Sequence, residues 1–389
     1  MNLNLKKGGY LVNIKSQFAL LFTGGGARTA YQVGVIAGLK SICDQEKILF
    51  PFKTITGYSG GAINAAYLAS EFDNLDTAIP LLETMWKNVQ SEEIYRSDFP
   101  SIMNIIGKWV AQLTIGKFLD KKNARLSLLD ATPLMRLLTD KINFRKLGSN
   151  IQKGIIDGLS VSAFNYSTGI NEIFYQSSIG VKEWEGSRRV GINKTISLKH
   201  IMASASIPII FPSVKIKTDF YGDGSLRNYA PLSPALHLGA NKIFVIGVTK
   251  KNKERAIKEH HYPSLVRILG MVLNAALLDA SHVDYQVSQR INELIGLIDH
   301  EKRPMKMVDI FMMSPSKDLG EIAMQYSHRL PRMIKFFLRE MGSKKEGADI
   351  LSYLLFTPEF NQAIIQLGKT DIQNRRDEVV HFLTSKDNE

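Results

Sequence analysis

The sequence predicts an α/β protein with a mostly parallel central sheet, helices on the faces of that sheet, and a helical C-terminal region. Two consecutive segments, residues 17–43 and 48–70, each have the pattern of a strand, a glycine-rich turn and a helix. Two such units in succession predict a parallel sheet, because each return to a parallel strand runs through a helix on one face. From about residue 320 onward the pattern is helical and basic.

The first unit contains a run of glycines directly after its strand. Residues 17–23 are mostly apolar, which predicts a buried strand, and residues 29–43 carry apolar side chains at helical spacing. The turn between them consists of Gly24, Gly25, Gly26, Ala27 and Arg28. Residues 1–16 have the composition of a short polar leader.

The second unit contains the most informative turn of the chain. Its apolar stretch at residues 48–55 predicts a buried strand, and residues 62–70, rich in small side chains, predict a helix. The turn between them fits the pattern G-x-S-x-G, with Gly57 and Gly61 on either side of Ser59. A serine on a sharp turn from strand to helix is the arrangement of a nucleophile elbow, in which glycines permit close packing. We interpret Ser59 as a catalytic nucleophile, with an ordinary tight turn as the alternative.

The chain after this unit continues to alternate between helices and strands. Residues 75–90 and 132–147 have helical patterns, and residues 155–164 and 172–177 have the pattern of neighbouring strands. Residues 94–129 are apolar but interrupted by proline and glycine, which suits a cap over a site.

A second dense segment covers residues 198–212. It predicts a short helix of small residues that ends before Pro208. Residues 214–221 predict a hairpin that leads into Gly222, Asp223 and Gly224.

Two strands and a long helix complete the expected domain. Residues 241–248 and 308–313 predict strands, and residues 263–298 predict a long apolar helix. We therefore expect one α/β domain over residues 17–315, followed by a helical, basic C-terminal region over residues 316–389.

The composition is that of a globular protein, with 44% hydrophobic and 22% charged residues. The single cysteine, Cys43, has no partner for an internal disulfide, which fits a reducing compartment. We find no pattern of a secretory signal and no uncharged run long enough to span a bilayer. These features favour a cytoplasmic protein, with peripheral association with the inner face of a membrane as a further option.

The formal net charge of +12 favours polyanionic partners, either an anionic membrane surface or nucleic acid. No nucleic-acid motif of recognisable spacing is present, so we rank the membrane first and expect no nucleic acid. Residues 329–339 offer one hypothesis for membrane contact, because a helix there would be basic on one side and apolar on the other. The alternative is that its apolar side packs on the protein core.

A serine that transfers acyl groups needs an oxyanion hole and a base. For the oxyanion hole we select the turn at residues 24–28, because consecutive glycines before a helix let backbone N–H groups converge on one point. A nucleotide-binding loop is the rival interpretation. The G-x-G-x-x-G pattern fails at Thr29, however, and no P-loop lysine follows. Arg28 either anchors a phosphate head group or caps this loop.

The base is less evident from the residues alone. Asp223 stands between two glycines after a hairpin, but Asp-Gly is a common turn signal. None of the eight histidines follows a late core strand, where an α/β-hydrolase places its base. No cluster of histidine and cysteine indicates a metal site, and we expect no cofactor.

Several motifs, taken together and in order, resemble the patatin-like phospholipase family of bacterial acyl hydrolases. They are Gly24-Gly25-Gly26-Ala27-Arg28, Gly57-Tyr58-Ser59-Gly60-Gly61, the segment 203–212, and Asp223-Gly224-Ser225 with Asn228 and Pro231 after it. The resemblance covers residues 17–250. It implies a three-layer α/β/α patatin-like fold and hydrolysis of lipid acyl esters by a Ser–Asp dyad, without a catalytic histidine.

By this resemblance Ser59 is the nucleophile and Asp223 its base, and the N–H groups around Gly25, Gly26 and Ala27 hold the oxyanion with Arg28 beside them. The expected substrate is a membrane phospholipid or lysophospholipid. The chain departs from many family members at Thr29, Tyr58, Gly60 and Ser225, and we expect Tyr58 to narrow the acyl pocket. Two alternatives remain: a histidine-dependent α/β-hydrolase esterase, and a catalytically inactive patatin-like domain that binds lipid. The sequence leaves the oligomeric state open.

Overall fold

A computed structural model describes residues 5–7, 10–12, 17–96, 127–250, 264–332, 334–335 and 348–385. In this part of the chain the main sheet has ten strands, and its central order is β12-β11-β3-β4-β5-β6-β8-β7, with the β9–β10 hairpin attached to β5. The strands are β3 (Phe18–Phe22), β4 (Thr54–Tyr58), β5 (Gly158–Asn165), β6 (Ile170–Ser177), β7 (Trp184–Gly186), β8 (Arg189–Asn193), β9 (Val214–Ile216), β10 (Asp219–Gly222), β11 (Lys242–Ile246) and β12 (Asp309–Met313).

The sheet is mostly parallel, as the two strand–turn–helix units predict. All neighbours from β12 to β5 run parallel, whereas β6, β7 and β10 each pair antiparallel with a neighbour. The carboxyl ends of β3 and β4 therefore lie side by side, so the glycine run and Ser59, which follow these two ends, are brought to one edge of the sheet.

Helices cover both faces of this sheet, which confirms the expected α/β fold class. The helices that carry most of the packing and the site are α1 (Ala30–Gln45), α2 (Gly60–Ser70), α3 (Leu75–Asn88), α4 (Ser91–Ile94), α6 (Thr132–Lys141), α7 (Phe144–Gln152), α8 (Leu198–Ser204), α9 (Ser233–His237), α10 (Leu265–Leu277) and α11 (Asp279–Gly296). Along β3, Leu20 and Phe22 pack in one core with α1 and α2, and Leu21 packs in a second core with α9 and α11. This alternation follows from the two-residue period of a strand.

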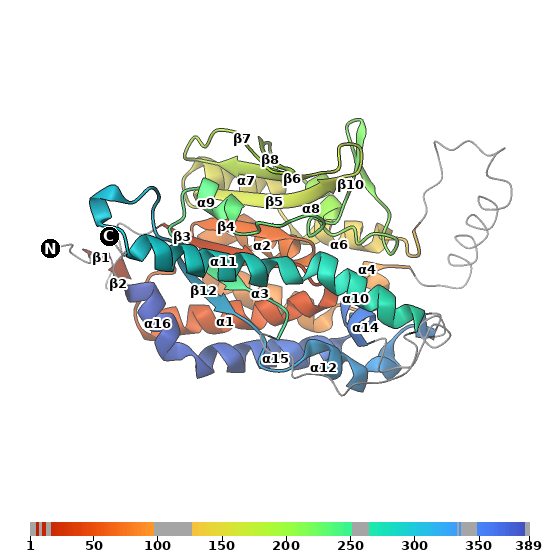
Figure 1. Cartoon of the computed structure of the whole chain (residues 1–389). Helices are drawn as coiled ribbons and strands as arrows, with labels where there is room; N and C mark the ends of the chain where they lie inside the picture. The colour runs from red at the N-terminus through yellow and green to blue at the C-terminus, as the bar shows by residue number, and fades with distance from the viewer. Residues whose placement is uncertain are drawn as a thin grey trace.

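The C-terminal helices share the main core with the rest of the molecule. They are α12 (Leu319–Gln325), α14 (Ala348–Leu354), α15 (Pro358–Asn374) and α16 (Arg376–Thr384). Helix α15 lies along α1 (Figure 1), and the two backbones approach so closely that a Cβ on Gly34 would lie 2.0 Å from the carbonyl oxygen of Ile365. The division of the chain at residue 316 remains a prediction about domain organisation.

Three of the expected elements have different boundaries. The strand expected over residues 48–55 begins only at Thr54. Pro51 precedes it, and proline donates no hydrogen bond to a ladder. The helix expected over 132–147 is two helices, because Asn143 caps a new one by accepting a hydrogen bond from the Lys146 N–H. The helix expected over 263–298 is also two, α10 and α11, which meet at Leu278.

Three further expectations concern segments that the structure describes only in part. Within residues 1–16, expected as a polar leader, β1 (Leu5–Lys7) and β2 (Tyr10–Val12) pair antiparallel. The expected cap at 94–129 falls mostly on residues 97–126, which lie outside the described part. The interfacial helix hypothesised for 329–339 is described only at 329–332 and 334–335.

In that described portion, Leu330 and Ile334 are buried in the main core. This burial favours the alternative of packing on the protein. Among the described helices, none combines the length and apolar character needed to cross a bilayer.

Candidate active site

Ser59 stands on a strained turn between β4 and α2. Strand β4 ends at Tyr58, α2 begins at Gly60, and Ser59 itself has φ 54° and ψ −136°. A non-glycine residue with positive φ is uncommon, and such strain persists only where the surroundings fix the backbone. Close packing fixes the backbone of this turn, because a Cβ on Gly61 would lie 2.4 Å from the carbonyl oxygens of both Phe22 and Thr23. A Cβ on Gly57 would likewise lie 2.7 Å from the Gly61 carbonyl oxygen.

Asp223 lies beside Ser59, although 164 residues separate the two in sequence. The Ser59 hydroxyl donates a hydrogen bond of 2.6 Å to Oδ2 of Asp223. The other carboxylate oxygen, Oδ1, accepts a hydrogen bond of 2.8 Å from the Ser225 N–H. Both catalytic candidates are buried, and Asp223 has no exposed surface. The structure thus brings together the two residues that the sequence analysis selected for nucleophile and base.

Residues of α8 and the following turn fix both members of this pair. Ser204 Oγ accepts a hydrogen bond of 2.9 Å from the Ser59 N–H, and the Ser204 carbonyl accepts one from the Gly224 N–H. The Asp223 N–H donates to the carbonyl of Ser206. The sequence analysis did not assign a role to Ser204, although it singled out the segment that contains it. Close packing at Gly224, where a Cβ would lie 2.0 Å from the Ser162 carbonyl oxygen, fixes the turn against β5.

Burial changes the acidity of Asp223. Removal from water disfavours the charged carboxylate and raises the pKa of Asp223 to about 6. The hydrogen bonds from Ser59 and from the Ser225 N–H oppose this rise because they stabilise the carboxylate. A carboxyl group with a pKa near 6 is a stronger base than an ordinary aspartate and still ionises at neutral pH.

The glycine turn forms the wall beside Ser59. A Cβ on Gly24 would lie 2.8 Å from the Cβ of Ser59, so only glycine fits there. Gly26 begins a short 3-10 helix, and Gly26 and Gly60 line the same pocket as Ser59. Two helix starts therefore face the serine, and the first N–H groups of a helix have no partner within it. The Arg28 N–H, in contrast, donates to the Gly25 carbonyl.

The Arg28 side chain binds the C-terminal helix α14. Its Nε donates to Ser352 Oγ at 2.7 Å, and its Nη2 lies 3.1 Å from Oδ1 of Asp349. The guanidinium also lies over the ring of Tyr353. Arg28 is buried, and of the two roles that the sequence left open, these contacts favour the structural one.

A buried network of polar side chains from α1, α2 and α3 binds the backbone on both sides of the glycine turn. Asn64 donates to the carbonyl of Thr29 and to the side chain of Gln32, and Gln32 donates to the carbonyl of Thr23. Trp86 Nε1 donates to the side-chain oxygen of Asn64. These bonds satisfy backbone groups on both sides of the turn, which fixes its conformation.

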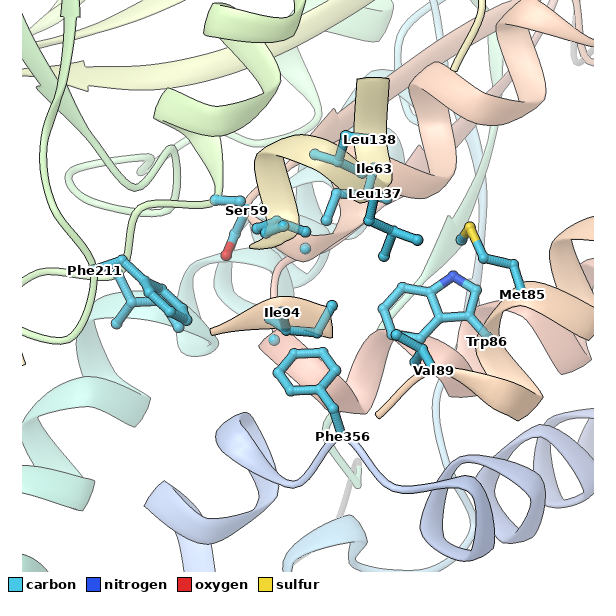
Figure 2. Close-up of a pocket in the computed structure, with 15 residues that line it drawn as sticks. Ser59, Ile63, Met85, Trp86, Val89, Ile94, Leu137, Leu138, Phe211 and Phe356 are labelled. Carbon is cyan, nitrogen blue, oxygen red and sulfur yellow. The ribbon is translucent and has the colours of Figure 1, made fainter. Parts of the chain in front are cut away.

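A narrow apolar pocket begins at Ser59, with a cavity volume of about 30 Å³. Figure 2 shows Ser59 and Phe211 at one end and Met85 and Trp86 at the other. Its lining consists of Gly26, Ser59, Gly60, Ile63, Met85, Trp86, Val89, Ile94, Leu134, Leu137, Leu138, Ala205, Ile207, Phe211 and Phe356.

Tyr58 is not part of this lining. It packs in the core on the opposite face of the sheet, so the expectation that it narrows the pocket is wrong.

His200 lies in α8, four residues before Ser204, but it does not line the pocket at Ser59. Its Nδ1 accepts a hydrogen bond from the Ser197 N–H, and its ring packs on Phe174. Burial lowers the pKa of His200 to about 4. No histidine lines the pocket among the described residues, and no cluster of potential metal ligands occurs among them.

Comparison with known proteins gives one family match. The sequence model described as "Patatin-like phospholipase" matches residues 20–236, and no curated protein matches the chain. Among solved structures, VipD from Legionella pneumophila is 12% identical, with a TM-score of 0.37 over 94% of this chain and 67% of that chain. The type III effector protein ExoU is 11% identical, with a TM-score of 0.36 over 95% of this chain and 54% of that chain. The chain thus spans about two thirds of VipD and just over half of ExoU.

Proposed function

Because the chain belongs to the patatin-like phospholipase family, whose model matches residues 20–236 of its 389, we propose that it hydrolyses acyl esters of membrane lipids with a Ser59–Asp223 dyad. Family membership supports lipid hydrolysis in general. The observation that supports the dyad is the 2.6 Å hydrogen bond that the Ser59 hydroxyl donates to the buried Asp223 carboxylate. The proposed substrate is a phospholipid or lysophospholipid.

In the proposed reaction, Asp223 accepts the proton of Ser59 as Oγ attacks the ester carbonyl carbon. The tetrahedral intermediate collapses, and Asp223 returns the proton to the departing alcohol, which leaves an acyl-enzyme. Water then attacks the acyl carbonyl and gives its proton to Asp223. The second tetrahedral intermediate collapses, Asp223 gives this proton to Oγ of Ser59, and the fatty acid is released. Asp223 therefore acts first as a base and then as an acid in each half-reaction.

The negative charge that develops on the carbonyl oxygen needs fixed donors. Backbone N–H groups at Gly25, Gly26 and Ala27 are the proposed donors, together with that of Gly60 at the start of α2. This assignment is supported by the position of Gly26 and Gly60, which line the pocket next to Ser59. We propose that Arg28 acts on this site only by positioning the turn, because its side chain is engaged with Ser352 and Asp349.

A fluorophosphonate probe tests the nucleophile, since it reacts covalently with activated serines. We expect the wild type to be labelled, and Ser59→Ala to lose both labelling and hydrolysis while it keeps its fold, as judged by circular dichroism. Hydrolysis of a diacyl phospholipid and of a lysophospholipid then distinguishes the two substrate classes. Labelling of folded Ser59→Ala at the wild-type rate would identify a different nucleophile. Lipid binding by a wild type that is neither labelled nor active would support the alternative of an inactive lipid-binding domain.

A further inference from the structure

The pocket at Ser59 shares a wall with a second cavity. The second cavity has a volume of about 490 Å³ and lies between α2, α3 and α6. Met85, Val89 and Leu137 line both cavities. The residues that line only the second cavity include Leu81 and four charged side chains, Glu71, Glu93, Asp140 and Lys141.

The two cavities differ in chemistry. Apart from Ser59 and the glycine backbone, the first is lined by apolar side chains, whereas the second contains three carboxylates and a lysine. Each methylene group of an alkyl chain gains about 0.8 kcal/mol when it is buried among apolar side chains. It gains far less in a cavity of charged groups and water. An alkyl chain that enters at Ser59 is therefore stabilised only as far as the shared wall.

We propose that Met85, Val89 and Leu137 form the end wall of an acyl-chain pocket that begins at Ser59, and that this wall sets the longest acyl chain the enzyme accepts. The inference rests on the proposed hydrolysis of acyl esters and adds the determinant of chain-length specificity. The substrate it implies carries one unbranched acyl chain that fits a narrow pocket.

The positions of the three side chains support this role. Met85 and Leu137 are half-buried, as expected for residues between an apolar interior and a polar cavity, and Val89 is 4% exposed. Met85 and Trp86 are adjacent on α3, and Figure 2 shows both at the end of the pocket away from Ser59. The position of Trp86 is fixed by its hydrogen bond to Asn64. The Met85 side chain is long and flexible, so it is the better of these two neighbours for a substitution that changes the pocket length.

Four variants separate the wall from its surroundings. Met85→Ala and Leu137→Ala each remove side-chain volume from the wall and connect the two cavities. Val89→Phe adds volume and shortens the pocket. Leu81→Ala is the matched control, because Leu81 also lies on α3 and lines the second cavity but not the first.

The experiment measures kcat/KM for saturated p-nitrophenyl esters of four to eighteen carbons. We expect the optimum of Met85→Ala and Leu137→Ala to move at least two carbons longer. An ester two carbons beyond the wild-type limit should be hydrolysed about tenfold faster, the value of two newly buried methylene groups. Val89→Phe should move the optimum to shorter chains, and Leu81→Ala should keep it. An unchanged optimum in both alanine variants, when both are folded and active on the four-carbon ester, overturns the proposal. So does an equal shift in Leu81→Ala.

A binding measurement separates failure of the wall from failure of the proposed function. Saturated fatty acids of increasing length compete with a fluorescent fatty acid for Ser59→Ala and for Ser59→Ala combined with Met85→Ala. We expect the longest acid bound to increase in the combined variant even though neither protein turns over substrate. If the wild type hydrolyses no ester but this shift is observed, the hydrolase assignment fails and the wall stands. If esters are hydrolysed but neither assay shows a shift, only the wall is wrong.

Discussion

The guanidinium of Arg28 and the carboxylate of Asp349 lie 3.1 Å apart, although 321 residues separate them in the chain. Arg28 follows the glycine turn beside Ser59, and Asp349 lies in the first turn of α14. Its neighbour in α14, Ser352, accepts a second hydrogen bond from Arg28. The C-terminal region is thereby connected directly to the turn that we propose as the oxyanion hole.

We predict that loss of this ion pair lowers activity without altering substrate binding. Arg28 is almost fully buried, and its charge is costly in an apolar interior unless it is paired. Asp349→Ala should loosen the turn and reduce kcat about tenfold, with KM little changed, on a soluble ester assayed well below the unfolding temperature.

Glu359→Ala is the control for this prediction. It removes an ion pair with Arg329 that is largely exposed, and such pairs contribute at most about 1 kcal/mol. Its kcat should stay within about twofold of the wild type. Equal rates for Asp349→Ala and wild type would show that the turn keeps its geometry without α14.

The sequence was sufficient for the parts of the site that depend on local pattern. The order of strand, glycine and helix around Gly24 and Ser59 follows from residues a few positions apart, and the structure has these elements nearly where predicted. The break at Asn143 was missed because the apolar pattern continues across it. Its signal, an asparagine at a helix N-cap, is nevertheless present in the sequence.

Contacts between segments that are distant in the chain could not be predicted from local sequence pattern. Nothing local to Arg28 indicates Asp349, and nothing near Tyr58 indicates that its ring packs on the opposite face of the sheet from the pocket. The pKa of Asp223 also depends on burial by several segments, and the residues next to Asp223 in the sequence give no sign of this burial. The family resemblance supplied the pairing of Ser59 with Asp223, which spacing alone left undetermined.

We predict that kcat/KM falls as pH decreases through about 6, because Asp223 acts as base only when it is ionised. An unperturbed histidine has a similar pKa, so the inflection alone does not identify the base. Asp223→Asn provides the distinction and should reduce activity as severely as Ser59→Ala, since an amide cannot accept the proton. In His200→Ala the inflection near pH 6 should persist, because burial lowers the pKa of His200 to about 4. An inactive, folded histidine variant alongside an active Asp223→Asn would favour the histidine-dependent esterase.

We predict that Lys242 fixes the end of the last helix. Its ammonium is buried at the start of β11 and donates hydrogen bonds to the carbonyls of Phe382 and Ser385, at the C-terminal end of α16. Lys242→Met keeps the length of the side chain but leaves these carbonyls without their donor. We expect a loss of about 1–3 kcal/mol in stability and faster proteolysis near the C-terminus.

Lys302→Met is the matched control, because Lys302 is 77% exposed and pairs with an equally exposed Asp299. Its unfolding midpoint should match that of the wild type, since exposed pairs of this kind contribute little. A similar loss of stability in both variants would assign the effect of Lys242→Met to the general loss of positive charge.

The same burial that makes Asp223 a useful base should also destabilise the folded protein at neutral and alkaline pH. Its pKa is raised to about 6 in the folded state, against about 3.9 when unfolded. The folded state therefore holds the proton more tightly, and the stability this provides is complete below pH 4 and lost as pH rises through 6. Asp223→Asn removes the buried charge, so we expect the inactive variant to be more stable than the wild type at pH 8, by on the order of 2–3 kcal/mol. The difference should shrink toward pH 4, where the carboxyl of the folded wild type is protonated and no buried charge remains. Denaturant unfolding at pH 8 and pH 4 measures the difference in the free energy of unfolding between the two proteins. A wild type more stable than Asp223→Asn at pH 8 would show that the ionised carboxylate does not destabilise the folded state.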